Sequence, residues 1–343
     1  FKVWDANKYR MMYAVKGYTN LLRNIHVSNV NGTIYVAGDD TNIREYDLTL
    51  QDKAKRFFSG HTNRVRHIDV SNDGKKMLSC GDDGSVILWN LVTYEKKCYR
   101  GHEKRVWSVC FIDNTHFASA GEENDIYLWE TNKSNPIAFL RGHTNWIWDI
   151  SYNATQKMLI SAGEDNTCRL WDVQERKEIH CFVEHKKWLF AASFDVFGWY
   201  AITASADHTA NIYDINKREL ICTLSGHKGW VWSAIFIEEN IVATGSQDST
   251  IRIWKIDYEQ KMAICERTLN KHTSWVVSLE YSKELKLLYS ASADETVKIW
   301  STDNYQYLGE LQIDKPYDRM KIAGVKGLTD SEKLSMLRLG AEE

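Results

Sequence analysis

Histidine, serine or threonine, and aspartate return at regular spacing along this chain, and such groups could serve as general bases, nucleophiles or metal ligands. The histidines that share one repeat position are His61, His102, His143, His185, His227 and His272. Their fixed period favours a structural role, because a satisfied hydrogen-bond network is the usual reason for buried polar groups. We therefore predict that none of these residues is catalytic.

Other patterns typical of enzymes or metal sites do not occur in the sequence. His180 and His185 superficially suggest a metal site, but His185 is the repeat histidine and the spacing is not that of an HExxH helix. The chain has neither a Walker-type phosphate loop nor a nucleophile elbow. Its seven cysteines form no CxxC pair, which favours buried thiols in a reducing compartment over disulfides or a zinc site. We predict no enzyme activity, no metal and no cofactor.

The elements that position these residues form a repeating unit, because an aromatic residue closes a short apolar run every 40 to 46 residues. The closing residues are Trp4, Tyr46, Trp89, Trp129, Trp171, Tyr213, Trp254 and Trp300. A period of this length indicates stacked copies of one supersecondary unit. In the unit that ends at Trp171, four short alternating runs are separated by Gly, Asn and Asp turns, which predicts a four-stranded antiparallel meander. A single sheet of this kind leaves both of its faces exposed to water. When several such sheets pack radially around a central axis, each covers the faces of its neighbours.

The recurring order Gly-His, Ser-x-x-x-Asp and Trp-Asp resembles the WD40 repeat of β-propellers, over residues 1 to about 312. The resemblance implies an all-β fold, a seven-bladed WD40 β-propeller of four-stranded antiparallel blades, with eight blades as the open alternative. It also implies a hydrogen-bonded tetrad of His, Ser or Thr, Asp and Trp in each blade. The complete tetrads are His61, Ser79, Asp83 and Trp89; His143, Ser161, Asp165 and Trp171; His227, Thr244, Asp248 and Trp254; and His272, Ser290, Asp294 and Trp300.

Three blades depart from the tetrad pattern. Blade three has Glu123 in the Asp place, and blade five ends in Tyr213. Blade one keeps Asp40 but has Tyr18, Val36 and Tyr46 at the other three positions. We therefore expect blade one to be the least rigid.

The ends of the chain divide it into three predicted segments. Residues 1–15 read as two surplus strands from the end of an upstream blade, residues 16–313 as the propeller, and residues 314–343 as a tail. Thr329 and Glu332 form a capping box that predicts a short C-terminal helix. The tail resembles C-termini of bacterial WD40-repeat proteins, some of them sensor ends of signal-transducing NTPases. Because residue 1 is Phe, we expect a processed chain or a piece of a longer one, whose upstream domains are among the expected partners.

Seven tryptophans share two register positions, three and five residues after the repeat histidine. They are Trp107, Trp146, Trp148, Trp188, Trp230, Trp232 and Trp275, and Phe190 takes the matching place in blade five. Ile147 and Val231 should face the core, and strict alternation puts both flanking residues on the opposite face. We expect an aromatic arc on the rim of the top opening, over blades four to seven.

In blades one to three the same positions hold mostly arginine. The arginines are Arg23, Arg64, Arg66 and Arg105, and the position before the tetrad Asp adds the carboxylates Asp39, Asp82, Glu122 and Glu164. Trp and Arg are enriched in interface hot spots, so the two arcs predict a partner-binding top face. The alternative is that the tryptophans pack together as core and that the arginines merely pair with neighbouring carboxylates.

Composition narrows the class of partner. The formal net charge of −3 offers no excess of cations for a phosphate backbone, and no run approaches the 18 apolar residues of a membrane span. We predict a cytoplasmic, non-enzymatic scaffold with a signalling role that binds a protein or peptide, not nucleic acid or membrane. Two alternatives stay open: a C-terminal ligand-sensing propeller of a larger signal-transducing NTPase, and a methyl-lysine or cation reader beside Glu164. The Trp-Asp pairs lack an Arg two places on, which disfavours a ubiquitin-ligase substrate receptor.

Overall fold

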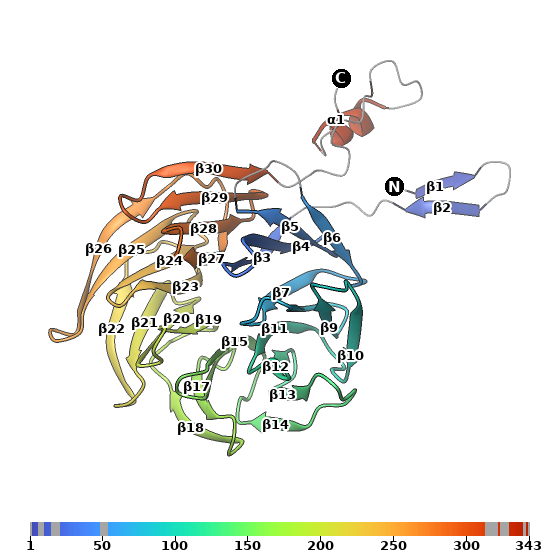
Figure 1. Ribbon diagram of the computed structural model, residues 1–343. Coiled ribbons are helices and arrows are strands. Elements are labelled where there is room, and N and C mark those ends of the chain that lie inside the picture. The colour runs from blue at the N-terminus through green and yellow to red at the C-terminus, as the bar shows by residue number, and fades with distance from the viewer. Residues whose placement is uncertain are drawn as a thin grey trace.

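Seven four-stranded antiparallel sheets are arranged in a ring in the computed structural model (Figure 1). The model describes residues 2–5, 10–14, 21–48, 54–312, 322, 329–338 and 341. Within each sheet the strands follow one another in chain order, so each blade is a meander. The predicted all-β, seven-bladed propeller is confirmed.

The strands of the blades alternate direction from the innermost to the outermost. Blade one is β3 (Leu22–Ser28), β4 (Thr33–Gly38), β5 (Asn42–Asp47) and β6 (Arg56–Ser59); blade two is β7 (Val65–Val70), β8 (Lys76–Gly81), β9 (Ser85–Asn90) and β10 (Lys96–Arg100); blade three is β11 (Val106–Phe111), β12 (His116–Gly121), β13 (Asp125–Glu130) and β14 (Ala138–Arg141); blade four is β15 (Ile147–Asn153), β16 (Met158–Gly163), β17 (Cys168–Asp172) and β18 (Lys177–Phe182). Blade five is β19 (Leu189–Phe194), β20 (Tyr200–Ser205), β21 (Thr209–Asp214) and β22 (Glu219–Ser225); blade six is β23 (Val231–Glu238), β24 (Ile241–Ser246), β25 (Ile251–Asp257) and β26 (Met262–Leu269); blade seven is β27 (Val276–Ser282), β28 (Leu287–Ser292), β29 (Thr296–Ser301) and β30 (Tyr307–Gln312).

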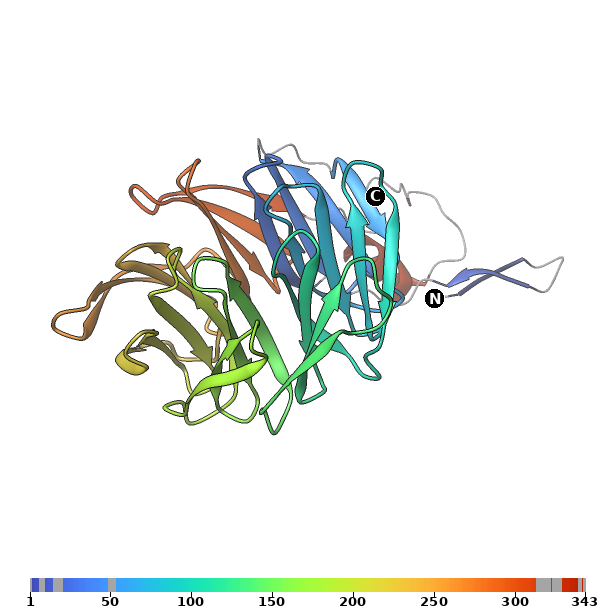
Figure 2. The ribbon, with the colours of Figure 1, turned by 60° about the horizontal axis from the view of Figure 1, so that its bottom comes forward.

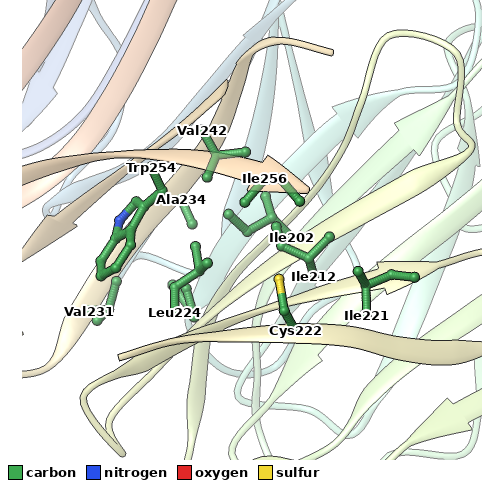
Figure 3. Close-up of a cluster of buried hydrophobic side chains, with 12 residues drawn as sticks. Ile202, Ile212, Ile221, Cys222, Leu224, Val231, Ala234, Val242, Trp254 and Ile256 are labelled. Atoms are coloured by element: carbon green, nitrogen blue, oxygen red, sulfur yellow. The ribbon is translucent and has the colours of Figure 1, made fainter. Parts of the chain in front are cut away.

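The core lies between neighbouring blades rather than inside any one of them. The second strand of each blade is buried on both faces, as in β16, whereas an outer strand such as β14 alternates between buried and exposed residues. Figure 3 shows one of the clusters, in which Ile202 and Ile212 of blade five meet Val231, Val242 and Trp254 of blade six. Each blade therefore depends on both neighbours for its apolar burial.

Side chains of the innermost strands also join each blade to the next by hydrogen bonds. At six of the seven junctions, a backbone N–H of one blade donates to a side-chain oxygen of a neighbouring blade. The donors and acceptors are Ile68 N–H and Asn24 Oδ1 (3.0 Å), Phe111 N–H and Asp69 Oδ2 (2.7 Å), Ile150 N–H and Ser108 Oγ (3.1 Å), Ala192 N–H and Asp149 Oδ2 (3.1 Å), Leu279 N–H and Ser233 Oγ (3.2 Å), and Ile25 N–H and Ser278 Oγ (3.3 Å). At the junction of blades five and six, Ser193 Oγ donates to the Ala234 carbonyl at 2.9 Å. The links run around the whole ring, and the bond from Ile25 to Ser278 closes it.

The N-terminal strands β1 (Lys2–Asp5) and β2 (Arg10–Ala14) form a separate two-stranded sheet that lies outside the ring (Figures 1 and 2). Their pairing is irregular between Val3 and Trp4. Blades four to seven show the same irregularity directly before their own closing aromatic residue, for example between Leu170 and Trp171. The hairpin thus repeats the register of the third and fourth strands of a blade.

The tail contains one helix, α1 (Asp330–Arg338), where the sequence predicts a short C-terminal helix. The Lys333 N–H donates to the Thr329 carbonyl at 2.9 Å, and this hydrogen bond closes the first turn of α1. The side chain of Glu332 lies outside the described residues, so the predicted capping box is not tested. Neither α1 nor any other described helix has the length and apolar character needed to cross a bilayer.

The cysteines are all free thiols. Cys98 is exposed, and Cys181 and Cys265 are half-buried, so the expectation of buried thiols is wrong for these three. They lie on the outer strands β10, β18 and β26, where no neighbouring blade covers the sheet completely.

Candidate functional site

Four of the blades bring together the complete tetrads. In blade four, His143 Nδ1 lies 2.9 Å from Asp165 Oδ2 and His143 Nε2 lies 2.7 Å from Ser161 Oγ. The Trp171 indole N–H donates to the same Ser161 Oγ at 2.8 Å. The same contacts recur in the tetrads of His61, Ser79, Asp83 and Trp89, of His227, Thr244, Asp248 and Trp254, and of His272, Ser290, Asp294 and Trp300. These histidines are therefore occupied in a buried network rather than free for catalysis.

The local sequence explains why the tetrad carboxylates are held in place. Asp165 closes the turn between β16 and β17, where its Oδ1 accepts bonds from the Thr167 N–H at 3.1 Å and the Thr167 hydroxyl at 2.7 Å. The residue after it, Asn166, takes a left-handed φ of 65°, which Asn tolerates. The Thr144 N–H of the preceding loop donates to Oδ2 at 3.0 Å. One carboxylate thus fastens two loops at the same end of the blade.

The tetrad carboxyls have lowered pKa values. Burial, the largest influence, would raise the pKa of each, but bonds to the histidine, to a Ser or Thr hydroxyl and to backbone N–H groups outweigh it. The groups whose pKa lies below the usual range for this reason are Asp83, Asp165, Asp207, Asp248 and Asp294. The pKa of Glu123 is lowered in the same way by His102, which lies 2.9 Å away.

The divergent blades keep part of this network. Glu123 takes the Asp role, and His102 also contacts Ser119, which accepts the Trp129 N–H. Blade five keeps His185, Thr203 and Asp207, while the Tyr213 hydroxyl accepts from Asn211 at 3.1 Å. In blade one Asp40 forms an ion pair with Arg44 instead, and Tyr18 lies outside the described residues.

A bulge at the start of each innermost strand decides where the rim residues point. The register skips one residue in every blade: Arg23, Arg66, Trp107, Trp148, Phe190, Trp232 and Val277. A bulge residue is unpaired and bends its strand, which re-aims the side chain. All seven line one central cavity of about 650 Å³, and we call the end of the cavity where they lie the top face.

The bulge corrects the prediction that both members of a pair such as Trp146 and Trp148 share one face by alternation. Trp148 is the bulge residue of β15 and lines the cavity, whereas Trp146 precedes the strand and does not. The tryptophans and Phe190 therefore form two layers. The inner aromatics are the bulge residues Trp107, Trp148, Phe190 and Trp232, and the outer tryptophans, which directly precede their strands, are Trp146, Trp188, Trp230 and Trp275. Of the outer tryptophans, Trp275 also lines the cavity.

The inner aromatics pack across the cavity mouth. Trp107 stacks on Trp148 with ring centroids 4.0 Å apart, and Phe190 stacks on Trp232 at 4.1 Å. Trp148 and Trp232 meet edge to face at 6.3 Å, which joins the two stacks. Trp107 and Phe190 each keep only 6% of their surface exposed, so their predicted direct role in partner binding stays a prediction that their burial does not support. The alternative that the tryptophans pack as core describes Trp107, and Phe190 is buried in the same way by its aromatic neighbours.

Three outer tryptophans are exposed. Trp146 keeps 37% of its surface accessible, and Trp188 and Trp275 each keep 42%, while Trp230 is half-buried. Ring contacts connect the outer tryptophans to one another and to the inner aromatics. The ring centroids of Trp188 and Trp230 are 6.4 Å apart, and Trp275 stacks on Trp232 with centroids 6.1 Å apart. An aromatic surface therefore extends over blades four to seven of the top face.

The arginine arc is largely neutralised by its own neighbours. Arg23 contacts Asp39 through two bonds of 2.7 and 3.2 Å, and Arg66 contacts Asp82 through bonds of 2.6 and 2.7 Å. The outer pair is looser, since Arg64 lies 3.4 Å from Asp39 and Arg105 lies 3.6 Å from Glu122. The bidentate pairs leave little donor capacity on Arg23 and Arg66 for a partner.

Glu164 differs from the other rim carboxylates, since no ion pair joins it to a cation within the described part of the chain. Its backbone N–H donates to the Trp146 carbonyl at 2.7 Å, so the main chain of Glu164 is joined to that of an exposed tryptophan. Burial, and then the charge of Glu122, raise the pKa of Glu164. This blade of the top face therefore carries a carboxyl group without a paired cation on a residue whose main chain is bonded to Trp146.

Deeper in the cavity lies a polar cluster that sequence reasoning missed. His26 Nδ1 is 3.7 Å from Asp69 and 3.9 Å from Glu280, three residues from blades one, two and seven. Burial, and then the Asp69 charge, raise the pKa of Glu280 to about 8, and burial lowers the pKa of His26. Asp69 and Glu280 each lie eight residues after the repeat histidine of their blade. The rim positions compared in the sequence lie three and five residues after that histidine, and extending the comparison by three residues would have included this cluster. Among the described residues no group of His, Cys, Asp and Glu is arranged to hold a metal ion.

Comparison with known proteins identifies the repeat. The family model described as "WD domain, G-beta repeat" matches residues 52–90, 94–130, 134–172, 218–255 and 263–301. Human DDB1- and CUL4-associated factor 10 is 37% identical over 70 residues, which are 20% of this chain and 12% of that protein. Nuclear distribution protein nudF of Aspergillus flavus is 42% identical over 74 residues (21% and 15%), and protein transport protein SEC13 of Yarrowia lipolytica is 34% identical over 68 residues (19% and 23%).

These matches cover less than a quarter of the length of each relative. The three relatives are eukaryotic proteins and not bacterial NTPase sensors, so the expected bacterial likeness of the tail finds no support among them.

Proposed function

This chain belongs to the WD40-repeat family, and on that premise we propose that it is a non-enzymatic module that binds a protein or peptide partner on its top face. The observation that carries the proposal is the exposure of Trp146, Trp188 and Trp275 around a single opening. Large indole surfaces left open on one face of a soluble protein mark interaction sites. A partner that covers them gains both apolar burial and ring contacts.

The two layers of the aromatic surface have different parts in this proposal. The outer tryptophans contact the partner, and the inner aromatics hold them at fixed positions, as Trp107 does for Trp146 at a centroid distance of 5.2 Å. Arg64 and Arg105, with 46% and 53% of their side chains exposed, extend the surface toward blades two and three. A rigid aromatic platform costs little ordering entropy on binding, which favours affinity.

Replacing the exposed tryptophans together, as Trp146→Ala, Trp188→Ala and Trp275→Ala, is expected to weaken partner binding at least about a hundredfold, since each desolvated hot-spot Trp is worth about 2 kcal/mol or more. The measurement is a pull-down from native lysate with quantitative mass spectrometry. Trp199→Ala is the matched control, because Trp199 is 48% exposed but lies at the opposite end of β19 and β20. A partner recovered equally by the triple variant and the wild type would place the site elsewhere.

A second candidate function is a cation reader, favoured by the unpaired Glu164, whose backbone N–H is bonded to the Trp146 carbonyl. An indole face next to an unneutralised carboxylate attracts a methyl-ammonium group. Peptides with trimethylated lysine should then bind at least about tenfold more tightly than unmodified ones, by a cation–π gain of about 1 to 2 kcal/mol. Glu164→Gln should remove the affinity but leave the thermal midpoint unchanged, and equal binding of both peptides would exclude this function.

A third candidate is the sensing propeller of a larger switch protein. The hairpin β1–β2 supports it, since its register repeats that of the outer half of a blade. We propose that this hairpin is the outer half of a further blade. A parent gene without a nucleotide-binding domain would exclude the sensor.

The name of the human relative links that protein to DDB1 and CUL4. Since the match covers 12% of it, we propose for this chain only that its partners are proteins.

A further inference from the structure

The charges on the top face differ between its two sides. In blades one to three the rim carboxylates Asp39, Asp82 and Glu122 form ion pairs with arginines. In blades five to seven the same rim position holds Ala206, Gln247 and Ala293, which carry no charge. The tetrad carboxylates of these blades keep their negative charge but are largely buried, and they accept bonds from their histidines and from loop N–H groups. This second side therefore exposes few anionic side chains.

Three lysines stand on that side, directly before the outer tryptophans. Lys186 and Lys187 precede Trp188, and Lys228 lies two residues before Trp230. All three side chains are exposed, and within the described residues none of their ammonium groups pairs with a carboxylate. Their backbones are fixed, because the Lys186 and Lys228 N–H groups donate to Asp207 and Asp248 at 3.0 and 2.9 Å. The tetrads thus hold unpaired cations beside the aromatic surface.

The remaining charges of the same loops do not cancel this potential. Glu184 precedes the repeat histidine of blade five, and Glu295 follows the tetrad Asp of blade seven. Against them stand the three lysines and Lys271. Among the exposed side chains of these loops, lysines therefore outnumber carboxylates, and they lie beside aromatic rings on a chain whose net charge is −3.

We propose that the segment docking on this surface is an acidic peptide with aromatic or aliphatic anchors, seated over blades five and six. Its apolar side chains cover Trp188 and Trp230, and its carboxylates meet Lys186, Lys187 and Lys228. Charge complementarity of this kind selects partners and speeds their encounter. The inference rests on the proposed function, because it names the class of partner for the same top face.

A single-stranded nucleic acid would also combine negative charge with stacking groups. The top face disfavours it, because its cations form no continuous track: Glu164 of blade four lies between the lysines of blades five and six and the exposed Arg64 and Arg105. A strand crossing the mouth would meet Glu164 and the carboxylates of blades one to three, and its backbone charge continues at every nucleotide. An acidic peptide can place its charges over the lysines alone.

The test measures fluorescence anisotropy of labelled short peptides against the 343-residue chain. The probes are an alternating Glu/Phe peptide, the same peptide with Gln in place of Glu, one with Lys in place of Glu, and oligouridylate. The acidic peptide is expected to bind at least about tenfold more tightly than the neutral and basic peptides at low salt, and to lose that preference at high salt.

Charge reversal at Lys186→Glu, Lys187→Glu and Lys228→Glu should abolish the preference and leave binding of the Gln peptide unchanged. The matched control reverses Lys75, Lys157 and Lys283, which are exposed in turns at the opposite ends of their blades. The variant Trp188→Ala with Trp230→Leu should weaken every peptide, and its near-ultraviolet circular dichroism reports whether it is folded.

The outcomes separate the two proposals. Equal or tighter binding of the Gln or Lys peptide, still lost in the tryptophan variant, overturns the acidic partner and leaves the top-face function standing. Lysine-dependent binding of oligouridylate that exceeds peptide binding overturns it in favour of nucleic acid. Binding of no probe, or binding that ignores the tryptophans, overturns both.

Discussion

Asp165→Ala should lower the free energy of unfolding by about 3 to 5 kcal/mol, the largest effect we expect from a single substitution that leaves the apolar core intact. The Asp165 carboxylate is 5% exposed and accepts bonds from His143, Thr144 and Thr167. Alanine removes the acceptor and leaves these donors without a partner, which costs more than the bonds themselves contribute. Urea unfolding followed by circular dichroism measures the change.

Asp113→Ala provides the control for this prediction. The Asp113 carboxylate also accepts several local bonds, from Thr115 and His116, but it is 53% exposed. Water replaces those bonds when the carboxylate is removed, so we expect a loss of about 1 kcal/mol or less. Equal losses in the two variants would show that the tetrad contributes no more than an ordinary turn.

Acid should unfold the propeller cooperatively, because six tetrad carboxyls titrate together. Asp83, Glu123, Asp165, Asp207, Asp248 and Asp294 all have folded pKa values below their unfolded ones. A lowered folded pKa gives stability that is present above the unfolded value, about 4, and is lost as the pH falls toward the folded value. Each proton taken up on unfolding contributes a slope of about 1.4 kcal/mol per pH unit, so several together should give a slope several times as large.

Urea midpoints measured from about pH 6 down to about pH 2.5 test this slope. Glu123→Gln should reduce the proton uptake on unfolding by about one, since it removes one titrating member. Glu280 affects the stability over a different pH range, because its pKa in the folded protein is raised to about 8. Its contribution to the free energy of unfolding is complete below about pH 4.5 and is lost as the pH rises through 8. A stability that stays flat below pH 4 would contradict the prediction.

The sequence predicts the tetrads because the spacing from His143 to Trp171 is copied in other blades. The division of the tryptophans into two layers could not be read in the same way. It depends on a bulge at Trp148, and alternation along one strand gives no sign of an extra residue. The burial of Trp107 and Phe190 depends on neighbours across the cavity mouth, such as Trp148 and Trp232, which meet although they lie two blades apart. The cluster of His26, Asp69 and Glu280 was missed because this repeat position has no common residue type: the other four blades have Cys110, Ser151, Ser193 and Ile235 there.

The ring of hydrogen bonds between blades also constrains the order of folding. Six junctions join residues 41 to 46 positions apart and can form as soon as the next blade has been synthesised. The seventh joins Ile25 to Ser278, 253 positions away. The cluster around Ile25 also takes Tyr289 and Ile299 from blade seven, so one flank of blade one stays bare until the last repeat arrives. Such long-range closure is slow, and the nascent chain meanwhile exposes an aggregation-prone apolar sheet face on its first blade.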